Sequence, residues 1–337
     1  MTLTSTDIHT HLDSLAKPQG SLGQLEQLAV RLAEAQQSLA PVTRPRGIIL
    51  FAGDHGVVES GVSAWPSAVT TAMMQTIAQG RASSNALARA AGCDLRLVDI
   101  GSITPLARPL PEFVTDRRLA AGTQNLALGP AMTVAQFDAA WAIGAEEARQ
   151  LVAQNYRLLL AGEMGIGNTT PAACLNMLLC NTDAAVSTGS GAGADDAMRA
   201  HKQAIVAAVV AREKPGLEND PKAAIAALCG FEIAAMAGFY AAAAQAGATI
   251  LLDGYVTTAA ALIAERLMPG SAQRMIAAHL SAEPGHRAAL DALGLVPILE
   301  WQMRLGEGSG ALVALPLLDA AAALLGEVAT LAEVMGK

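Results

Sequence analysis

The chain has 337 residues, of which 52% are hydrophobic and 3% aromatic, and its formal net charge is −8. This length suffices to bury a large core and is compatible with one large domain or two smaller ones. Basic residues form no dense block and do not alternate with aromatic ones, so we expect no nucleic-acid partner.

Residues 1–40 are expected to form a helical hairpin. The first helix should span Ser5–Leu15 and end at the turn-forming sequence 17–20. Ser21 can cap a second helix, in which apolar residues recur at helical spacing at Leu22, Leu25, Leu28, Ala29 and Leu32. We predict that this hairpin is a small subdomain joined by a C-terminal helix, and that residues 41–337 form a larger domain containing an active-site crevice.

Beyond Pro45, short apolar runs alternate with longer helical patterns. The runs expected as strands are Gly47–Ala52, Leu95–Ile100, Arg157–Ala161, Thr249–Leu252, Met275–Leu280 and Pro297–Leu299. The stretches expected as helices are Val69–Ala91, Ala131–Gln154, Pro171–Leu179, Pro221–Gln245, Thr257–Leu267 and His286–Leu293. This alternation predicts an α/β fold with a Rossmann-like parallel sheet and helices on both faces. The intervening segment Gly101–Asn125 is long and rich in Pro and Arg, and we expect it near a site or an interface.

The segment Ile233–Leu252 has no charged residue and is long enough to span a bilayer. It consists mostly of Ala and Gly, and 246–248 looks like a break between a helix and a strand. We therefore expect a buried helix–strand pair and no membrane partner. Residues 1–17 lack the basic and apolar regions of a signal peptide, which favours a cytoplasmic protein.

Polar and glycine-rich segments follow five of the expected strands, at 53–56, 101–102, 162–168, 253–254 and 281–286. The carboxyl ends of parallel strands share one edge of the sheet, where open α/β sheets bind their ligands. We therefore expect these segments to meet in one crevice.

The most informative segment is Gly162–Thr170, where a strand runs into three glycines in the sequence GEMGIG. Asn168, Thr169 or Thr170 can cap the following helix, which has a proline in its first turn. Glycines let a ligand approach the backbone, and a helix N-terminus suits a phosphate or carboxylate. The alternative is a tight turn whose glycines serve geometry alone. No lysine follows the glycines, so this is not a Walker loop.

A second glycine run, 189–193, does not have the GxGxxG spacing, and this disfavours dinucleotide binding. Lys202, on the following helix, can reach a phosphate or can be a solvated surface lysine. Glu307 lies between two glycines where an apolar helix begins. It can project into the crevice, or it can stabilise the dipole of that helix.

Asp54 and His55 have no nucleophile motif beside them, so we expect them to hold loops at the rim of the crevice by hydrogen bonds. The histidines and the four cysteines show no metal-ligand spacing. We therefore expect no metal site, and we expect the cysteines to be free thiols.

Several short motifs occur in the order found in nicotinate-nucleotide–dimethylbenzimidazole phosphoribosyltransferases, the enzymes of cobalamin lower-ligand assembly. They are Lys17–Gly23, Phe51–Val57, Gly162–Asn168, Gly230–Ile233, Leu252–Gly254, Ser281–Arg287 and Arg304–Ala311. Gln19 stands where the family's KPPGSLG motif has a second proline. The chain resembles this family over nearly its whole length, since the ordered set is much more specific than any one motif.

The resemblance implies that nicotinate mononucleotide and 5,6-dimethylbenzimidazole give α-ribazole 5′-phosphate and nicotinate, with inversion at C1′. It implies a homodimer and no metal or organic cofactor, with Glu307 as the general base and Glu163 as a second carboxylate near the ribose. The implied substrate-binding residues are Ser67, Gln75, Gly165, Gly167, Asn168, Lys202, Ser281, Arg304 and Leu305.

Two other classes of protein remain as alternatives. A nicotinamide-dependent oxidoreductase could use a similar sheet, but the missing GxGxxG spacing argues against it. A non-catalytic nucleotide- or azole-binding protein could have the same pocket, but the presence of both Glu163 and Glu307 argues against that.

Overall fold

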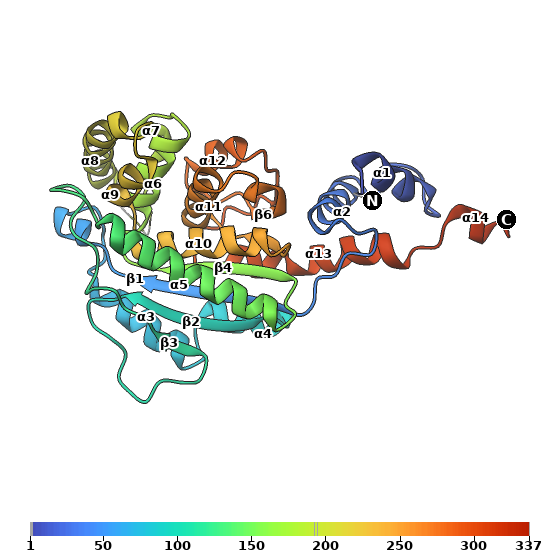
Figure 1. The fold of residues 1–337 in the computed structure, drawn as a ribbon, viewed down its shortest axis with the longest axis horizontal. Helices are drawn as coiled ribbons and strands as arrows, with labels where there is room; N and C mark the ends of the chain where they lie inside the picture. Colours follow the sequence, from blue (N-terminus) through green and yellow to red (C-terminus); the bar gives the residue numbers. More distant parts are fainter. Residues whose placement is uncertain (1–2, 192, 194, 337) are drawn as a thin grey trace.

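The computed structural model describes residues 3–191, 193 and 195–336, so Ala192 of the second glycine run lies outside the described residues. In this part of the chain, seven strands form one parallel sheet in the order β3-β2-β1-β4-β5-β6-β7 (Figure 1). Their bounds are β1 Arg46–Gly53, β2 Asp94–Gly101, β3 Val114–Asp116, β4 Leu158–Met164, β5 Thr249–Leu252, β6 Met275–His279 and β7 Pro297–Leu299. The predicted parallel sheet is confirmed. The strand order reverses between β1 and β4, which is where such sheets bind ligands.

Helices cover both faces of the sheet because the side chains of each strand alternate between two apolar cores. In β1, Ile49 and Phe51 enter one core, while Ile48 and Leu50 enter the other. The first core is covered by α5 Val134–Ala153, α6 Thr169–Leu179, α8 Asp196–Glu213, α9 Pro221–Leu228, α10 Phe231–Gln245, α11 Tyr255–Leu267 and α12 His286–Ala292. The second is covered by α1 Ser5–Ser14, α2 Gln24–Gln36, α3 Ala68–Ala78, α4 Ser83–Ala91 and α13 Ser309–Glu327. Short helices at α7 Ala184–Ser187 and α14 Leu331–Val334 complete the set of described α-helices.

Three local predictions were wrong. The helix expected over Val69–Ala91 is two helices, because Gly80 adopts a left-handed conformation with φ 73° between α3 and α4. The helix expected over Pro221–Gln245 is likewise interrupted, at Gly230, where a Cβ would lie 2.4 Å from the His55 ring. Ser21 does not cap α2, which begins at Gln24 with Gly23 in the capping position.

The N-terminal hairpin of α1 and α2 lies beside the C-terminal half of α13, as Figure 1 shows. Leu12 and Leu28 share a core with Leu325, and the His11 ring hydrogen-bonds the Leu325 carbonyl at 2.9 Å. The two helices are therefore present and pack against the C-terminal helix α13. Because this core continues under the sheet, the division into a subdomain of residues 1–40 and a larger domain stays a prediction.

The uncharged segment Ile233–Leu252 forms the buried helix α10 and strand β5, as the sequence predicted. Another helix, α13, is the one among the described residues that is long and apolar enough to cross a membrane, and 56% of its most apolar stretch is buried within the protein.

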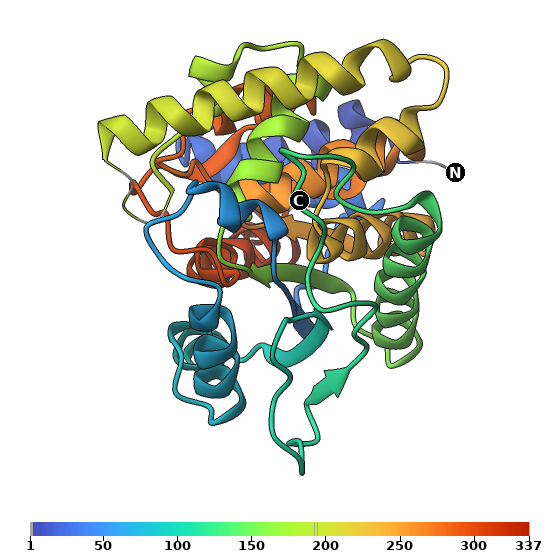
Figure 2. The same ribbon diagram turned by 90° about the vertical axis from the view of Figure 1, so that its left-hand side faces the viewer.

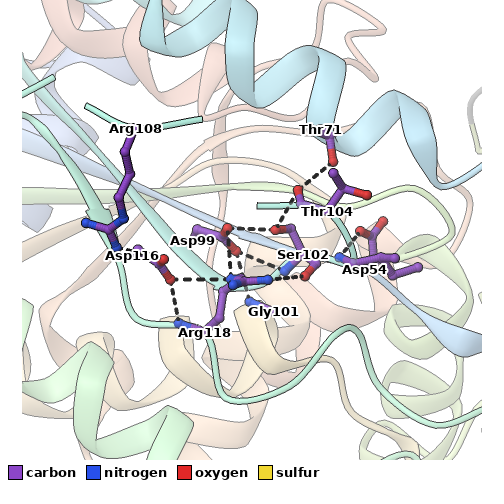
Figure 3. Close-up of polar contacts among 10 residues, drawn as sticks. Asp54, Thr71, Asp99, Gly101, Ser102, Thr104, Arg108, Asp116 and Arg118 are labelled. Carbon is purple, nitrogen blue, oxygen red and sulfur yellow. Dashed lines mark hydrogen bonds and ion pairs between the residues drawn. The ribbon is translucent and has the colours of Figure 1, made fainter. Parts of the chain in front are cut away.

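The segment Gly101–Asn125 contains the short strand β3, which the sequence did not predict, and it projects at the lower end of the view in Figure 2. Its start is fixed by side chains from other elements (Figure 3). The Asp54 carboxylate accepts a hydrogen bond from the Ile103 N–H at 2.8 Å, and the Thr71 hydroxyl donates to the Thr104 carbonyl at 2.9 Å. This segment is therefore tied to the end of β1 and to α3.

Candidate active site

A pocket of about 120 Å³ lies beyond the carboxyl ends of β4, β5 and β6. Its walls come from five segments that are far apart in the sequence, at 62–64, 163–169, 253–257, 279–283 and 304–306, together with Ser190, Gly191 and Lys202. Of the five segments expected to meet in one crevice, those after β4, β5 and β6 line this pocket, whereas 53–56 and 101–102 do not.

Most of the expected site residues line this pocket. They are Glu163, Gly165, Gly167, Asn168, Lys202, Ser281, Arg304 and Leu305. Glu307 is not in its wall but follows Gly306, which is. Ser67 and Gln75 do not line it: Ser67 is half-buried at the start of α3, and Gln75 is exposed on that helix. Their role in substrate binding stays a prediction.

Sequence reasoning did not single out three polar residues of the pocket, Asp253, His279 and Glu283. Asp253 and Glu283 belong to the LDG and SAEPGHR motifs, so their position after a strand was an available signal. His279 is the last residue of β6, inside an apolar run, and no motif marks it.

The loop after β4 needs its glycines for steric reasons. A Cβ at Gly165 would lie 2.4 Å from the Gly53 carbonyl oxygen. Gly167 has φ 89°, and a Cβ there would lie 2.6 Å from the Val58 side chain. The loop therefore packs closely against the segment after β1. This packing explains why the loop has glycines without invoking a ligand. Anion binding at this loop therefore needs other groups as well.

The N-terminus of α6 faces the pocket through Asn168 and Thr169. Asn168 occupies the capping position, but its side-chain amide donates to the Glu163 carboxylate instead of capping the helix. The Ile166 N–H is already bonded to the Thr70 hydroxyl at 3.1 Å.

Lys202 is almost completely buried, with 1% of its surface exposed, so its interpretation as a solvated surface lysine was wrong. Its ammonium donates to the Thr169 hydroxyl at 2.6 Å. Burial lowers the pKa of Lys202 to about 8, and the Glu283 carboxylate opposes that shift. A buried ammonium facing a pocket is well suited to an anionic ligand.

Arg304 and Leu305 lie at the exposed side of the pocket, and the Arg304 guanidinium donates to the Gly191 carbonyl at 3.5 Å. Ser281 lies deeper. Its backbone N–H donates to the His286 ring at 2.8 Å, and its hydroxyl accepts from the Glu283 N–H at 3.3 Å. Burial lowers the pKa of His286 to about 3, so this ring is neutral and can accept that bond.

Glu163, at the end of β4, is buried among other carboxyl groups. Burial raises the pKa of Glu163 to about 8, and the carboxylates of Glu232 and Asp253 add to the rise, whereas the bond from Asn168 opposes it. Glu163 is therefore largely protonated at neutral pH. It can donate a hydrogen bond in the free protein and can become negative when a positive charge develops beside it.

Asp253, rather than Glu307, caps α13. Its Oδ1 accepts from the N–H groups of Gly310 at 2.7 Å and Ala311 at 3.1 Å. The Glu307 carboxylate is directed instead to α4, where it accepts from the Ser84 hydroxyl at 3.1 Å. The hydrogen bond of Glu307 is therefore made to α4 and not to the helix that it precedes.

Asp54 and His55 hold loops together, as predicted, although both are buried rather than at a rim. Asp54 binds the segment after β2 through Ile103, and the His55 ring lies 2.8 Å from the Glu232 carboxylate at the start of α10. Their contacts fix the backbone beside the glycine loop after β4.

Comparison with known proteins defines the class of this chain. The sequence profile of the phosphoribosyltransferase family matches residues 3–335. A nicotinate-nucleotide–dimethylbenzimidazole phosphoribosyltransferase of Azotobacter vinelandii (strain DJ) is 46% identical over 95% of this chain and 90% of its own length. One of Pseudomonas putida (strain GB-1) is 45% identical over 96% of this chain and 92% of its own.

Solved structures agree in fold and sequence. The crystal structure of CobT from Thermus thermophilus superposes with a TM-score of 0.94 at 40% identity, covering 98% of both chains. A crystal structure of the dimethylbenzimidazole phosphoribosyltransferase from the same organism gives a TM-score of 0.92 at 39% identity, covering 99% of this chain and 98% of the other. The chain therefore belongs to the family of nicotinate-nucleotide–dimethylbenzimidazole phosphoribosyltransferases, as its ordered motifs predicted.

Proposed function

We propose that this protein transfers the phosphoribosyl group of nicotinate mononucleotide to 5,6-dimethylbenzimidazole, giving α-ribazole 5′-phosphate and nicotinate. The observation that carries the proposal is the identity of about 45% to relatives of that name over nearly the whole chain. The pocket supports it, because the buried Lys202 ammonium and the buried carboxyl groups of Glu163 and Glu307 lie at or beside one cavity.

The 5′-phosphate is assigned to the side of the pocket that holds Lys202, Ser281 and Arg304. These residues supply two cationic groups and a hydroxyl around one cavity, in a protein whose overall charge is negative. The N-terminus of α6 adds partial positive charge there. Gly165 and Gly167 line the same pocket, although their missing side chains leave room for the segment after β1 and not for the ligand.

In the transfer, a ring nitrogen of the azole forms a bond to C1′ as the bond from C1′ to the nicotinate nitrogen breaks. The electron pair of the broken bond leaves with nicotinate. Attack from the opposite face inverts C1′. The new ribosyl-azole is cationic until its other ring nitrogen loses a proton, and we assign that proton to Glu307. Glu163 favours the cationic ribosyl group electrostatically.

The aromatic base is assigned to the neighbourhood of α3, through Ser67, Gln75 and apolar neighbours such as Met74. In the structure, Met74 is fully buried in the second core and Gln75 is exposed on α3. We further propose that the protein is a cytoplasmic homodimer. This assembly is supported by the family resemblance and is tested by light scattering of the purified protein.

The deciding experiment incubates the protein with nicotinate mononucleotide and dimethylbenzimidazole and measures α-ribazole phosphate and nicotinate in equal amounts. Formation of both products, dependent on both substrates, supports the transferase. Reduction or oxidation of a nicotinamide cofactor without these products would favour the oxidoreductase. Tight binding of either substrate without turnover would favour the binding protein.

A further inference from the structure

We propose that Ser84 is a positioning residue, whose hydroxyl holds the Glu307 carboxylate in the orientation and charge state needed for proton transfer. The proposal rests on the proposed function, in which Glu307 is the base. It adds a second, distant residue that was absent from the motifs, at the start of α4.

The backbone around Glu307 is fixed in an uncommon conformation. Glu307 has φ 56°, and its neighbours Gly306 and Gly308 have φ 83° and 69°. A left-handed conformation is unfavourable for a residue with a side chain and persists only where its surroundings enforce it. Here Gly162 of β4 lies so close that a Cβ on it would be 2.5 Å from the Gly308 nitrogen. The strand therefore fixes the direction in which the Glu307 side chain leaves the backbone.

That direction leads to the N-terminus of α4. The Ser84 hydroxyl donates to Glu307 Oε2 at 3.1 Å, and the two residues are 0% and 1% exposed. The capping residue of α4 is Ala82, which has no side-chain acceptor for the free N–H groups of the first turn. The Glu307 carboxylate lies at this helix end and accepts from the Ser84 hydroxyl, although the two residues are 223 positions apart in the sequence.

The hydrogen bond from Ser84 favours the ionised form of Glu307 in surroundings that otherwise disfavour it. Burial raises the pKa of Glu307, the Ser84 hydroxyl and backbone amide lower it, and the Asp253 carboxylate raises it. The titratable groups that neighbouring elements place near Glu307 are Asp253 after β5 and Glu163 in β4, and of these the Asp253 carboxylate raises the pKa of Glu307. Ser84 is the group that favours the ionised base.

The test measures kcat against pH for phosphoribosyl transfer in the full-length protein. The acid limb of this profile is the low-pH range in which kcat falls as the base becomes protonated. In Ser84→Ala this limb should move to higher pH, because a bond to a charged acceptor is lost. The kcat should therefore fall by about tenfold or more at pH 6 and by much less at pH 9. The KM for the nucleotide should change little. Ser84→Thr keeps the hydroxyl and should keep the wild-type limb. The matched control is Ser83→Ala, since Ser83 is exposed in the same helical turn.

An unchanged acid limb in Ser84→Ala, at a wild-type melting temperature, would overturn the proposal. If Ser84→Ala does not fold, Ser84→Cys keeps the volume with a weaker donor. The limb should then move in the same direction by a smaller amount, and an unchanged limb overturns the proposal equally. Glu307→Gln separates the two claims. A normal rate in that variant rejects Glu307 as the base, whereas a slow Glu307→Gln with an unmoved limb in Ser84→Ala rejects only the role of Ser84.

Discussion

Glu163 and Gly306 are in such close contact that a Cβ on residue 306 would lie 2.2 Å from Glu163 Oε1. Gly306 also directly precedes Glu307 in the chain. One glycine therefore contacts the first carboxyl group that we assign to the chemistry and adjoins the residue that carries the second. Its φ of 83° is a second reason why this position requires glycine.

Gly306→Ala should therefore displace the Glu163 side chain, the Glu307 backbone, or both. Because misplacement of a catalytic group by about 1 Å can cost about 100-fold in rate, turnover should fall by that order. The control is Gly326→Ala near the end of α13, where a Cβ would meet open space. Turnover and melting temperature are measured on each variant, and normal turnover in Gly306→Ala would contradict the assignment of both carboxyl groups.

Glu307→Gln keeps the shape of the side chain and removes its basicity. A positioned general base contributes about 10²–10⁴-fold in rate, so turnover should fall within that range while both substrates still bind. Glu327→Gln, an exposed change at the end of α13, should have no effect. If the carboxylate serves only α4, the variant should instead lose about 0.3–1 kcal/mol of stability and keep its rate.

Lys202→Ala should weaken binding of nicotinate mononucleotide and leave binding of dimethylbenzimidazole nearly unchanged, as measured by calorimetry with each ligand. Since the pKa of Lys202 is about 8, nucleotide affinity of the wild type should also decline as the pH rises through 8. Lys202→Arg should not show that decline. Lys222→Ala, which removes a partly exposed lysine paired with Asp138, is the control. If Lys202→Ala lost equal affinity for both ligands, Lys202 would not be a phosphate contact.

The stability of the protein should depend on pH through Glu163. Its pKa rises from 4.5 to about 8 in the folded state, so between these values the folded protein holds a proton that the unfolded chain has lost. The favourable contribution of the protonated group is complete below pH 4.5 and is lost as the pH rises through 8. Glu163→Gln should therefore raise the melting temperature more at pH 8 than at pH 5. A constant difference across that range would show that Glu163 is ionised throughout.

Substitution of Gln75 tests the proposed base site. Gln75→Ala should change the preference among benzimidazoles more than the affinity for the nucleotide, with rates compared for dimethylbenzimidazole and unsubstituted benzimidazole. Gln79→Ala, on the exposed residue that ends α3, is the control. A fixed preference would place the base against other residues of this region.

The strands were predictable because each is a continuous apolar run bounded by turn residues, and β5 and β7 occur at the expected residues. The strand β3 was missed because three residues in a loop rich in Pro and Arg give no periodic signal. The breaks at Gly80 and Gly230 depend on a left-handed turn and on the nearby His55 ring, and neither is visible in local helical periodicity.

The site was predictable in part, because the segments after parallel strands must meet at one edge. The burial of Lys202 was not, since a lysine on a polar helix face resembles a solvated one until its contact with Thr169 is known. The hydrogen bond between Glu307 and Ser84 could not be predicted either, because no local sequence pattern relates residues so far apart.

The strand order has a consequence for how the chain acquires activity during synthesis. β1 pairs directly with β4, although more than a hundred residues separate them, and the Glu307 loop then packs on Gly162 of β4. Such long-range pairing closes large loops before it gains stability, which slows folding. A nascent chain that has emerged only as far as β6 already contains Lys202 and Thr169. It still lacks Ser281 and Arg304 as well as Glu307, so the phosphate side of the pocket and the general base are both completed only when the last part of the chain has emerged.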